Sequence, residues 1–271
     1  MSTNIANNSN FISLSTGGFI TLAPRNFEMK KSVFTTLIYL CISSLFAQSN
    51  NPVTIINPHY SLQLAGLDMA DKYGMSSGMG LDFMQITSNN FVWGVGTQFI
   101  FGNDIKDTTI LEHLMDDRGN IFGDNGEISS ITLFERGFHF SLKCGYFHPI
   151  IDNTKGLIAL GSLGFIQHKT RIQVETNNVP NLEEDYLKMY DGLSNGLSAS
   201  LFIGWMHMSE KGKGHFYTGF NFTNGFTKNR RSYNYNVNGS ITTARNDLLM
   251  GLKIGWVIPI SKRSNQEFYY N

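Results

Sequence analysis

The sequence predicts an all-β protein, a transmembrane antiparallel up-and-down β-barrel of about 8 strands of the outer-membrane type. Only 15% of its 271 residues are charged, whereas 27 are glycine and 13% are aromatic, a composition that favours a sheet with an apolar outer surface. Long segments alternate apolar with polar residues, as strands do when their two faces meet different surroundings. Short and long connections also alternate between these segments, as they do in barrels with short periplasmic turns and longer external loops.

We expect the first 47 residues to add nothing to the barrel. Met29-Lys30-Lys31 precedes an uncharged run that ends at Ala47, and this order of basic, apolar and small residues predicts a signal peptide over 29–47, cleaved near Ala47. The alternative, a membrane-spanning helix, would need about 20 apolar residues. Residues 1–28 lack periodicity, so we interpret them as an over-called start or a disordered extension.

The rest of the chain is expected to form one barrel. We assign 48–58 to a short N-terminal periplasmic segment, 59–259 to the barrel and 260–271 to a periplasmic C-terminal tail. The eight expected strands lie near 60–67, 76–87, 91–102, 131–147, 157–176, 194–208, 215–227 and 244–258.

Alternation assigns a face to most of these strands. Phe138 and Leu142 share the apolar face of the segment 131–147, and Leu252 lies on the apolar face of the last segment. We expect these faces to contact lipid, with the alternate residues in the lumen. The pattern does not decide the two faces of 157–176.

Five charged or titratable side chains lie on the expected luminal faces: Glu135, His139, Lys143, Asp247 and Lys253. The interior of an eight-stranded barrel is just filled by side chains. We therefore expect a luminal polar network that closes the barrel, with Lys253 pairing with Asp247 or another luminal acid. A proton or ion path through the same residues is the alternative.

The tryptophans are expected to mark a membrane interface. Trp93, Trp205 and Trp256 all fall at the ends of strands that meet short turns, which predicts an aromatic girdle.

Two external segments could bind partners. Lys228, Arg230 and Arg231 begin the last long loop, at the expected height of lipopolysaccharide phosphates. The loop 178–191 is a candidate partner loop, because tyrosine and leucine in an ordered loop suit a protein contact. They equally suit a loop that folds over the barrel mouth. Its candidate contact residues are Leu182, Tyr186, Leu187 and Tyr190.

We expect no metal and no cofactor. The acidic loop 103–130 contains a turn, Asp124-Asn-Gly-Glu127, that could take calcium, but it lacks the alternating oxygen ligands of an EF-hand loop. A solvated surface loop is the preferred interpretation. Within that loop, the segment 107–115 predicts a short capped helix.

A search for a nucleophile finds His139-Phe-Ser141 and His207-Met-Ser209, which resemble the His-x-Ser of lipid A deacylases. The first pair would share the lumen with Lys143, and the second would lie at the periplasmic end, away from an outer-leaflet substrate. No catalytic residue is therefore expected, and the formal net charge of zero argues against a nucleic-acid partner.

Several short strings resemble the small outer-membrane β-barrel domain proteins of the Bacteroidota, a broad family that includes a barrel component of the type IX secretion apparatus. They are Leu45-Phe-Ala-Gln48, Gly145-Tyr-Phe147, Gly255-Trp-Val-Ile-Pro259 and Phe268-Tyr-Tyr270. The resemblance covers roughly 48–271. Many outer-membrane proteins end on an aromatic residue of the last strand, whereas about a dozen residues follow Pro259 here.

Together these features predict a non-enzymatic outer-membrane protein with a plugged lumen. We expect it to act through its external loops, as an envelope structural protein or a component of a membrane complex such as a secretion apparatus. The lipid bilayer and lipopolysaccharide are expected partners, and another outer-membrane protein is a possible one. The alternative is a lipid-modifying enzyme or a narrow channel.

Overall fold

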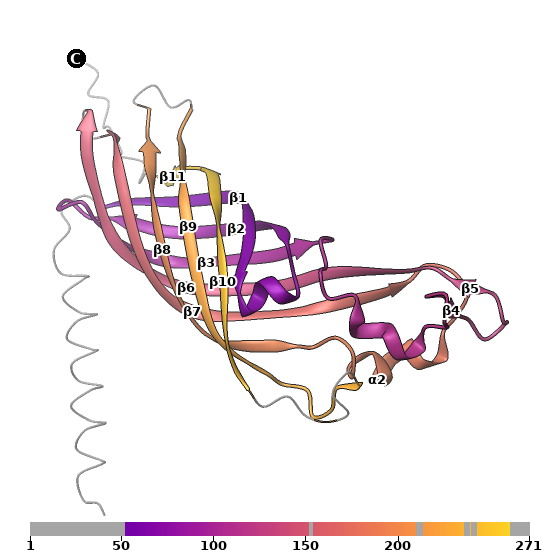
Figure 1. Ribbon diagram of the computed structural model, residues 1–271. Coiled ribbons are helices and arrows are strands. Elements are labelled where there is room, and N and C mark those ends of the chain that lie inside the picture. The colour runs from indigo at the N-terminus through magenta and orange to yellow at the C-terminus, as the bar shows by residue number, and fades with distance from the viewer. Residues whose placement is uncertain (1–51, 152–153, 210–213, 236–238, 240–242, 261–271) are drawn as a thin grey trace, which may run out of the picture. The chain divides into compact units, whose positions relative to one another are not determined.

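The computed structural model describes residues 52–151, 154–209, 214–235, 239 and 243–260. The expected signal peptide at 29–47 with its cleavage near Ala47, the segment 1–28 and the tail after residue 260 lie outside the described residues. The eight main strands are β1 (Val53–Leu67), β2 (Met75–Ile86), β3 (Phe91–Gly102), β6 (Ile131–Ile151), β7 (Lys155–Val174), β8 (Ser194–His207), β9 (Phe216–Asn229) and β10 (Ala244–Trp256) (Figure 1).

These strands form one closed antiparallel barrel. Each main strand pairs with the next in the order of the chain, and β10 returns to pair with β1 from His59↔Gly255 to Leu67↔Asp247. Closure gives every main strand two neighbours, so its backbone groups meet partners on both sides. The expected fold of about eight antiparallel strands is confirmed.

The first strand is longer than expected. β1 begins at Val53, so most of the segment 48–58, which we had assigned to the periplasm, belongs to the barrel. Asn57 and Pro58 interrupt the sequence pattern, because both residue types are rare within strands. They lie opposite the break between β10 and β11 (Ile258–Ile260), where β1 has no partner on that side, so the missing N–H of proline leaves the ladder intact there.

The expected alternation of faces is confirmed. Phe138, Leu142 and Leu252 are exposed on the outer wall. The residues that alternate with them on β6 and β10 are buried or half-buried inside. On β7, which the sequence left undecided, Ile158 and Ile166 point inward. Leu163, between them in the pattern, points outward.

The connections at one end of the barrel carry the smaller elements. These are η1 (Asp68–Asp71), η2 (Thr109–Leu114), β4 (Ile121–Phe122), β5 (Ile128–Ser129), η4 (Pro180–Leu182) and α2 (Glu184–Leu187). Within the described residues, no helix combines the length and the apolar character needed to cross a membrane. β6 and β7 are the longest strands and run past their neighbours toward β4 and β5 (Figure 1).

The expected helix at 107–115 forms as the six-residue 3₁₀-helix η2 instead of an α-helix. The Asp107 carboxylate accepts hydrogen bonds from the Thr109 backbone N–H at 3.2 Å and from its hydroxyl at 2.7 Å. This side-chain turn starts the helix, and at six residues it suits the tighter 3₁₀ geometry of short segments.

The barrel interior is layered. An apolar layer near the short turns contains Ile55, Met84, Phe147, Ile158 and Met206, among others. A second apolar layer lies toward the long loops and contains Met69, Tyr73, Ile100, Ile166 and Leu249. Buried polar side chains occupy the space between the two layers, and they form the candidate site.

Candidate functional site

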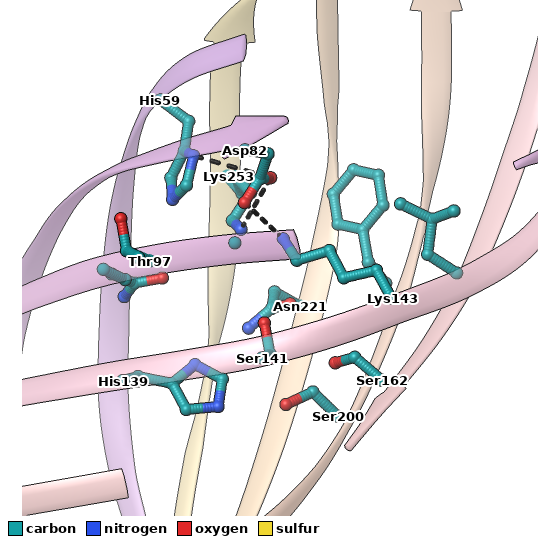
Figure 2. A pocket seen from close by; sticks show the side chains of 14 residues that line it. His59, Asp82, Thr97, His139, Ser141, Lys143, Ser162, Ser200, Asn221 and Lys253 are labelled. Atoms are coloured by element: carbon teal, nitrogen blue, oxygen red, sulfur yellow. Dashed lines mark hydrogen bonds and ion pairs between the residues drawn. The ribbon is translucent and has the colours of Figure 1, made fainter. Parts of the chain in front are cut away.

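Asp82 on β2 is the centre of the luminal polar cluster (Figure 2). Its carboxylate accepts a hydrogen bond from Lys143 Nζ on β6 at 2.5 Å and another from the Tyr217 hydroxyl on β9 at 3.2 Å. Lys253 Nζ on β10 lies 3.8 Å from the same carboxylate, and His59 Nδ1 on β1 lies 3.6 Å from it. Side chains from four other strands thus converge on one buried acid.

The cluster holds more positive than negative charge. Two lysines face a single carboxylate, and Lys253 and Asp82 are almost completely buried. A buried charge is stable only when it is paired and hydrogen-bonded. Removing Asp82 would therefore leave two buried ammonium groups without their counter-ion.

Gly96 on β3 makes room for this ion pair. It pairs with Asp82 in the β-ladder, and a Cβ added at Gly96 would lie 2.3 Å from Asp82 Oδ1 and 2.6 Å from Lys143 Cε. The Lys143 side chain therefore passes over Gly96, because only glycine, which has no Cβ, leaves space for it there.

The cavity beside the cluster is small. Its volume is about 20 Å³, and its lining includes His59, Gln98, His139, Ser141 and Asn221. A water molecule needs a cavity of roughly 10–15 Å³ on the same measure, so this space suits about one water.

The luminal residues expected from the sequence fall into separate groups. Lys143 and Lys253 meet at Asp82, which the sequence interpretation missed. His139 Nε2 lies 3.0 Å from Ser198 Oγ, with the donor set by the tautomer. Glu135 is buried and forms no ion pair with these groups among the described residues.

Of the two options that the sequence left for Lys253, it pairs with another luminal acid, Asp82, and not with Asp247. The Asp247 carboxylate lies 2.8 Å from His168 Nε2 and 3.4 Å from Arg245 Nε, and it accepts a hydrogen bond from the Thr227 hydroxyl. The two residues are six positions apart on β10, which separates them by roughly 20 Å along the strand. Lys253 therefore belongs to the Asp82 cluster and Asp247 to a second one.

The short connection between β1 and β2, at the same end as the long loops, closes the barrel above Asp247. Met69 of η1 and Tyr73 are completely buried against inward-facing Ile100 of β3, Ile166 of β7 and Leu249 of β10. Because these three strands lie on separate parts of the wall, η1 and Tyr73 extend across the lumen. Neither the loop's short length nor its composition had indicated this.

η1 is fixed in place by polar contacts. The Tyr73 hydroxyl lies 3.1 Å from Thr170 Oγ1, and the Tyr73 ring meets the His168 ring edge-on with centroids 5.6 Å apart. The Asp68 carboxylate accepts a hydrogen bond from the Asn246 backbone N–H at 2.8 Å. These contacts join the connection to both β7 and β10.

The candidate partner loop packs against the neighbouring external loop. Leu182 and Tyr190 are buried in a small core with Ile110, Leu111 and Ile121, and Leu187 packs against its edge. Of the four expected contact residues, Tyr186 alone is exposed. The loop is thus partly a structural element of the loop cluster.

An aromatic contact completes that loop cluster. The rings of His113, Tyr190 and Tyr235 lie nearly parallel, with centroid distances of 4.9–5.3 Å, and His113 Nε2 is 2.8 Å from the Tyr190 hydroxyl. Burial raises the pKa of Tyr190 to about 12, with a further contribution from Tyr235. Tyr190 therefore keeps its proton to a higher pH than an ordinary tyrosine, and its hydroxyl can donate to His113 Nε2.

The expected lipopolysaccharide contact is only partly free. Arg231 forms a two-point ion pair with Asp191, with Nε 2.7 Å from Oδ1, and this carboxylate raises the pKa of Arg231. Arg230 donates to the neutral Asn195 side chain at 2.6 Å, and Lys228 is exposed on the outer face of β9. Arg231 therefore joins two loops, while Lys228 and Arg230 keep their charge available.

The three tryptophans all lie toward the short-turn end of the barrel. Trp93 is near the start of β3, Trp205 is near the end of β8, and Trp256 ends β10. The side chain of Trp256 is strongly exposed.

The acidic loop 103–130 forms no metal cluster. Asn125 donates to Glu127 Oε2 at 3.1 Å within the turn that joins β4 to β5. Among the described residues, no group of three or more His, Cys, Asp or Glu side chains is arranged to hold a metal ion.

Solved structures similar to this chain are barrels of low sequence identity. Ail, the attachment invasion locus protein of Yersinia pestis, solved with the heparin analogue sucrose octasulfate, is 12% identical with a TM-score of 0.33, covering 77% of this chain and 99% of Ail. The N-terminal β-barrel domain of Pseudomonas aeruginosa OprF is 10% identical with a TM-score of 0.35, covering 78% of this chain and 100% of that domain. Neisserial surface protein A is 10% identical with a TM-score of 0.34, covering 76% and 96%.

No family model and no curated protein matches the sequence. Similarities of this size are too weak to transfer a function to this chain. Its architecture is established by its own strand pairing.

Proposed function

We propose that this protein is a non-enzymatic outer-membrane β-barrel with a closed lumen, which acts through its external loops. The observation that carries the proposal is the apolar outer wall. Large apolar side chains are exposed on every main strand, and Leu163 and Leu197 are 70% and 72% exposed. A soluble monomer rarely exposes a contiguous apolar patch of more than a few hundred Å². A lipid bilayer would bury this wall, with Trp93, Trp205 and Trp256 as its periplasmic aromatic girdle.

The layered interior supports a closed lumen. Apolar side chains fill the end near the short turns, the Asp82 cluster fills the middle, and Met69 and Tyr73 fill the end near the long loops. An ion would have to pass two apolar layers and one buried ion-pair cluster. The luminal residues Glu135, His139, Lys143, Asp247 and Lys253 then serve to fill and pair the interior.

The external loops are the surface left for a partner. The packed core of the loops at 103–130 and 175–193 gives them a defined shape, and Tyr186 is an exposed aromatic on that surface. An ordered loop with an exposed tyrosine suits a protein contact. We propose an envelope structural role or a place in a membrane complex, and the family resemblance of the sequence favours a Bacteroidota complex such as a secretion apparatus.

The His-x-Ser strings do not support the enzymatic alternative. His139 meets Ser198, while the adjacent Ser141 lines the central cavity. His207 stacks on Phe216, and the backbone N–H of Ser209 donates to His215 Nδ1. Neither histidine has a contact with the serine two residues away that would activate it as a nucleophile.

The test combines location with conductance. The full-length protein should fractionate with the outer membrane, migrate differently in gels before and after heating, and show no stable conductance in planar bilayers. Large, stable channels from the folded protein would overturn the closed lumen and favour the channel alternative. Recovery of the protein from the soluble fraction would overturn the membrane assignment itself.

A further inference from the structure

The outer wall carries a row of cations on one side only. Arg136 on β6 and Lys169 on β7 are direct partners in the ladder, and Arg171 follows on the same face of β7. Lys228 and Arg230 form a separate pair at the end of β9, with β8 between them and β7. On β1, β2, β3 and β10, the outward positions at the same end hold no lysine or arginine in the described part of the chain.

This row begins where the apolar wall ends. Along the outward face of β6, Phe138 is followed by Arg136, and along β7, Phe165 is followed by Gln167 and Lys169. If the apolar wall lies in lipid, these cations lie at the level of the outer-leaflet headgroups. Their position is therefore fixed by the same strand register that fixes the membrane band.

The cations face one another with little compensation. Like charges placed directly across a β-ladder repel, as Arg136 and Lys169 do here. Lys169 lies 3.6 Å from Asp191, but Asp191 is already held by Arg231. Arg136 and Arg171 form no ion pair with a carboxylate among the described residues. An anion bound between them would relieve this repulsion.

A groove with mixed polar and apolar walls includes Arg136. It has a volume of about 300 Å³, and its lining combines Met75, Phe101 and Phe134 with the polar residues Ser76, Ser77, Asn103 and Arg136. The Arg136 guanidinium lies over the Phe134 ring, 4.9 Å from the ring centroid, which holds the charge against the groove wall. Because Phe134 lies on the loop side of Arg136, the groove opens above the cations, and charge and groove together fit a phosphate attached to a sugar.

We propose that Arg136, Lys169 and Arg171 bind the phosphate of an outer-leaflet glycolipid of the lipid A type, and that the groove beside Phe134 takes the sugar that carries this phosphate. This inference rests on the proposed function, because it requires the apolar wall to lie in a membrane. Arginine binds phosphate oxygens through paired, charge-assisted hydrogen bonds. The proposed site places the principal lipid contact on β6 and β7, a different part of the wall from Lys228 and Arg230.

The experiment measures lipid affinity of the folded full-length barrel in detergent by native mass spectrometry, with monophosphoryl lipid A as the probe. The test variant is R136Q/R171Q. The control K106Q/R118Q removes two cations from the loop at 103–130, outside the row. We expect R136Q/R171Q to weaken binding by about tenfold or more, and the control to stay within about twofold of the parent protein.

Two further probes separate the sources of the phosphate. Lipid A from which the phosphate has been removed should bind the parent protein and R136Q/R171Q equally weakly. Inorganic phosphate at millimolar concentration should not displace monophosphoryl lipid A. Displacement by inorganic phosphate would overturn the lipid assignment, since it would identify a site for free anions.

A groove variant tests the sugar contact. S77F places a ring on the outward face of β2 at the groove, and it should weaken binding of monophosphoryl lipid A and of its deacylated phosphosugar by roughly fivefold, without weakening that of phosphatidylglycerol. Equal affinity of R136Q/R171Q and the parent protein, both recovered folded from the outer membrane, would overturn the glycolipid site and leave the proposed function standing. Failure of the parent protein to reach the outer membrane would instead contradict the proposed function.

Discussion

Lys143 Nζ lies 2.5 Å from Asp82 Oδ1, although β6 and β2 are separated in the sheet by β3. The lysine reaches the acid by crossing β3 above Gly96, where a side chain would collide with both partners. One short contact thus fixes three adjacent strands in register and places a positive and a negative charge in the centre of the lumen.

The first prediction concerns the counter-ion. D82N should destabilise the folded barrel by about 3–5 kcal/mol, because it leaves Lys143 and Lys253 buried without an acid. Urea titration of the barrel refolded in lipid vesicles measures this loss. K253M, which leaves Lys143 paired with Asp82, should cost less than about 2 kcal/mol.

A double variant separates charge from shape in the same cluster. D82L/K143M replaces the closest ion pair with apolar side chains, and it should recover at least half of the stability lost in D82N. If D82N proves as stable as the parent protein, the lysines are neutral or hydrated and the cluster does not hold the barrel closed.

The second prediction concerns Gly96. G96A should lower stability by about 1–3 kcal/mol, because the new Cβ would overlap the Asp82 carboxylate and the Lys143 side chain. Without this overlap, replacing a strand glycine with alanine would stabilise the barrel by about 0.5–1 kcal/mol. G161A is the matched control, since a Cβ there would lie 3.8 Å from its nearest neighbour, the Cys144 carbonyl oxygen. A loss in G161A equal to that in G96A would contradict the steric explanation.

The third prediction uses two adjacent residues on opposite faces of β10. Leu252 is 53% exposed on the outer wall, whereas Lys253 is 4% exposed inside the barrel. L252R should cost about 2–4 kcal/mol and impair membrane assembly, because its cation would face hydrocarbon. K253L should assemble normally and change stability by about 1 kcal/mol or less, since Asp82 keeps Lys143. Assembly yield and heat-modifiability report both effects, and the reverse order of effects would mean that the strand register is shifted by one.

The main strands were predictable because their outer faces are nearly pure apolar stripes. Phe138, Phe140 and Leu142 alternate with polar or small residues over a length that suits a membrane-spanning strand. β7 gave no parity because Ile158, Leu160 and Ile166 are apolar residues that point inward. An apolar lumen layer removes the contrast between faces on which the periodicity depends.

The site was less predictable than the strands, because partners in a barrel come from distant parts of the sequence. Lys143 and Lys253 were identified from their strand faces, but Asp82 lies in a segment where glycine and methionine weaken the pattern. Its alternation with outward-facing Leu81 and Phe83 was the available signal. The burial of Met69 and Tyr73 had no such signal, since a short connection can equally extend into solvent.

The fourth prediction separates two tyrosines of the same external loop. Tyr190 is 4% exposed and packs on His113 and Tyr235, whereas Tyr186 is 53% exposed. Y190A should loosen the loop cluster, and limited proteolysis should cut within 175–193 faster than in the parent protein, because the substitution leaves a cavity in a small core. Y186S should leave the proteolysis pattern unchanged but reduce recovery of a native complex from detergent-solubilised membranes, because it removes an exposed aromatic contact.

The heat-modifiable barrel should persist in both variants, since neither residue belongs to a main strand. A Y186S variant that retains every native partner would move the contact to another part of the external surface, and a Y190A variant with normal protease resistance would show that the ring contacts do not stabilise the loops.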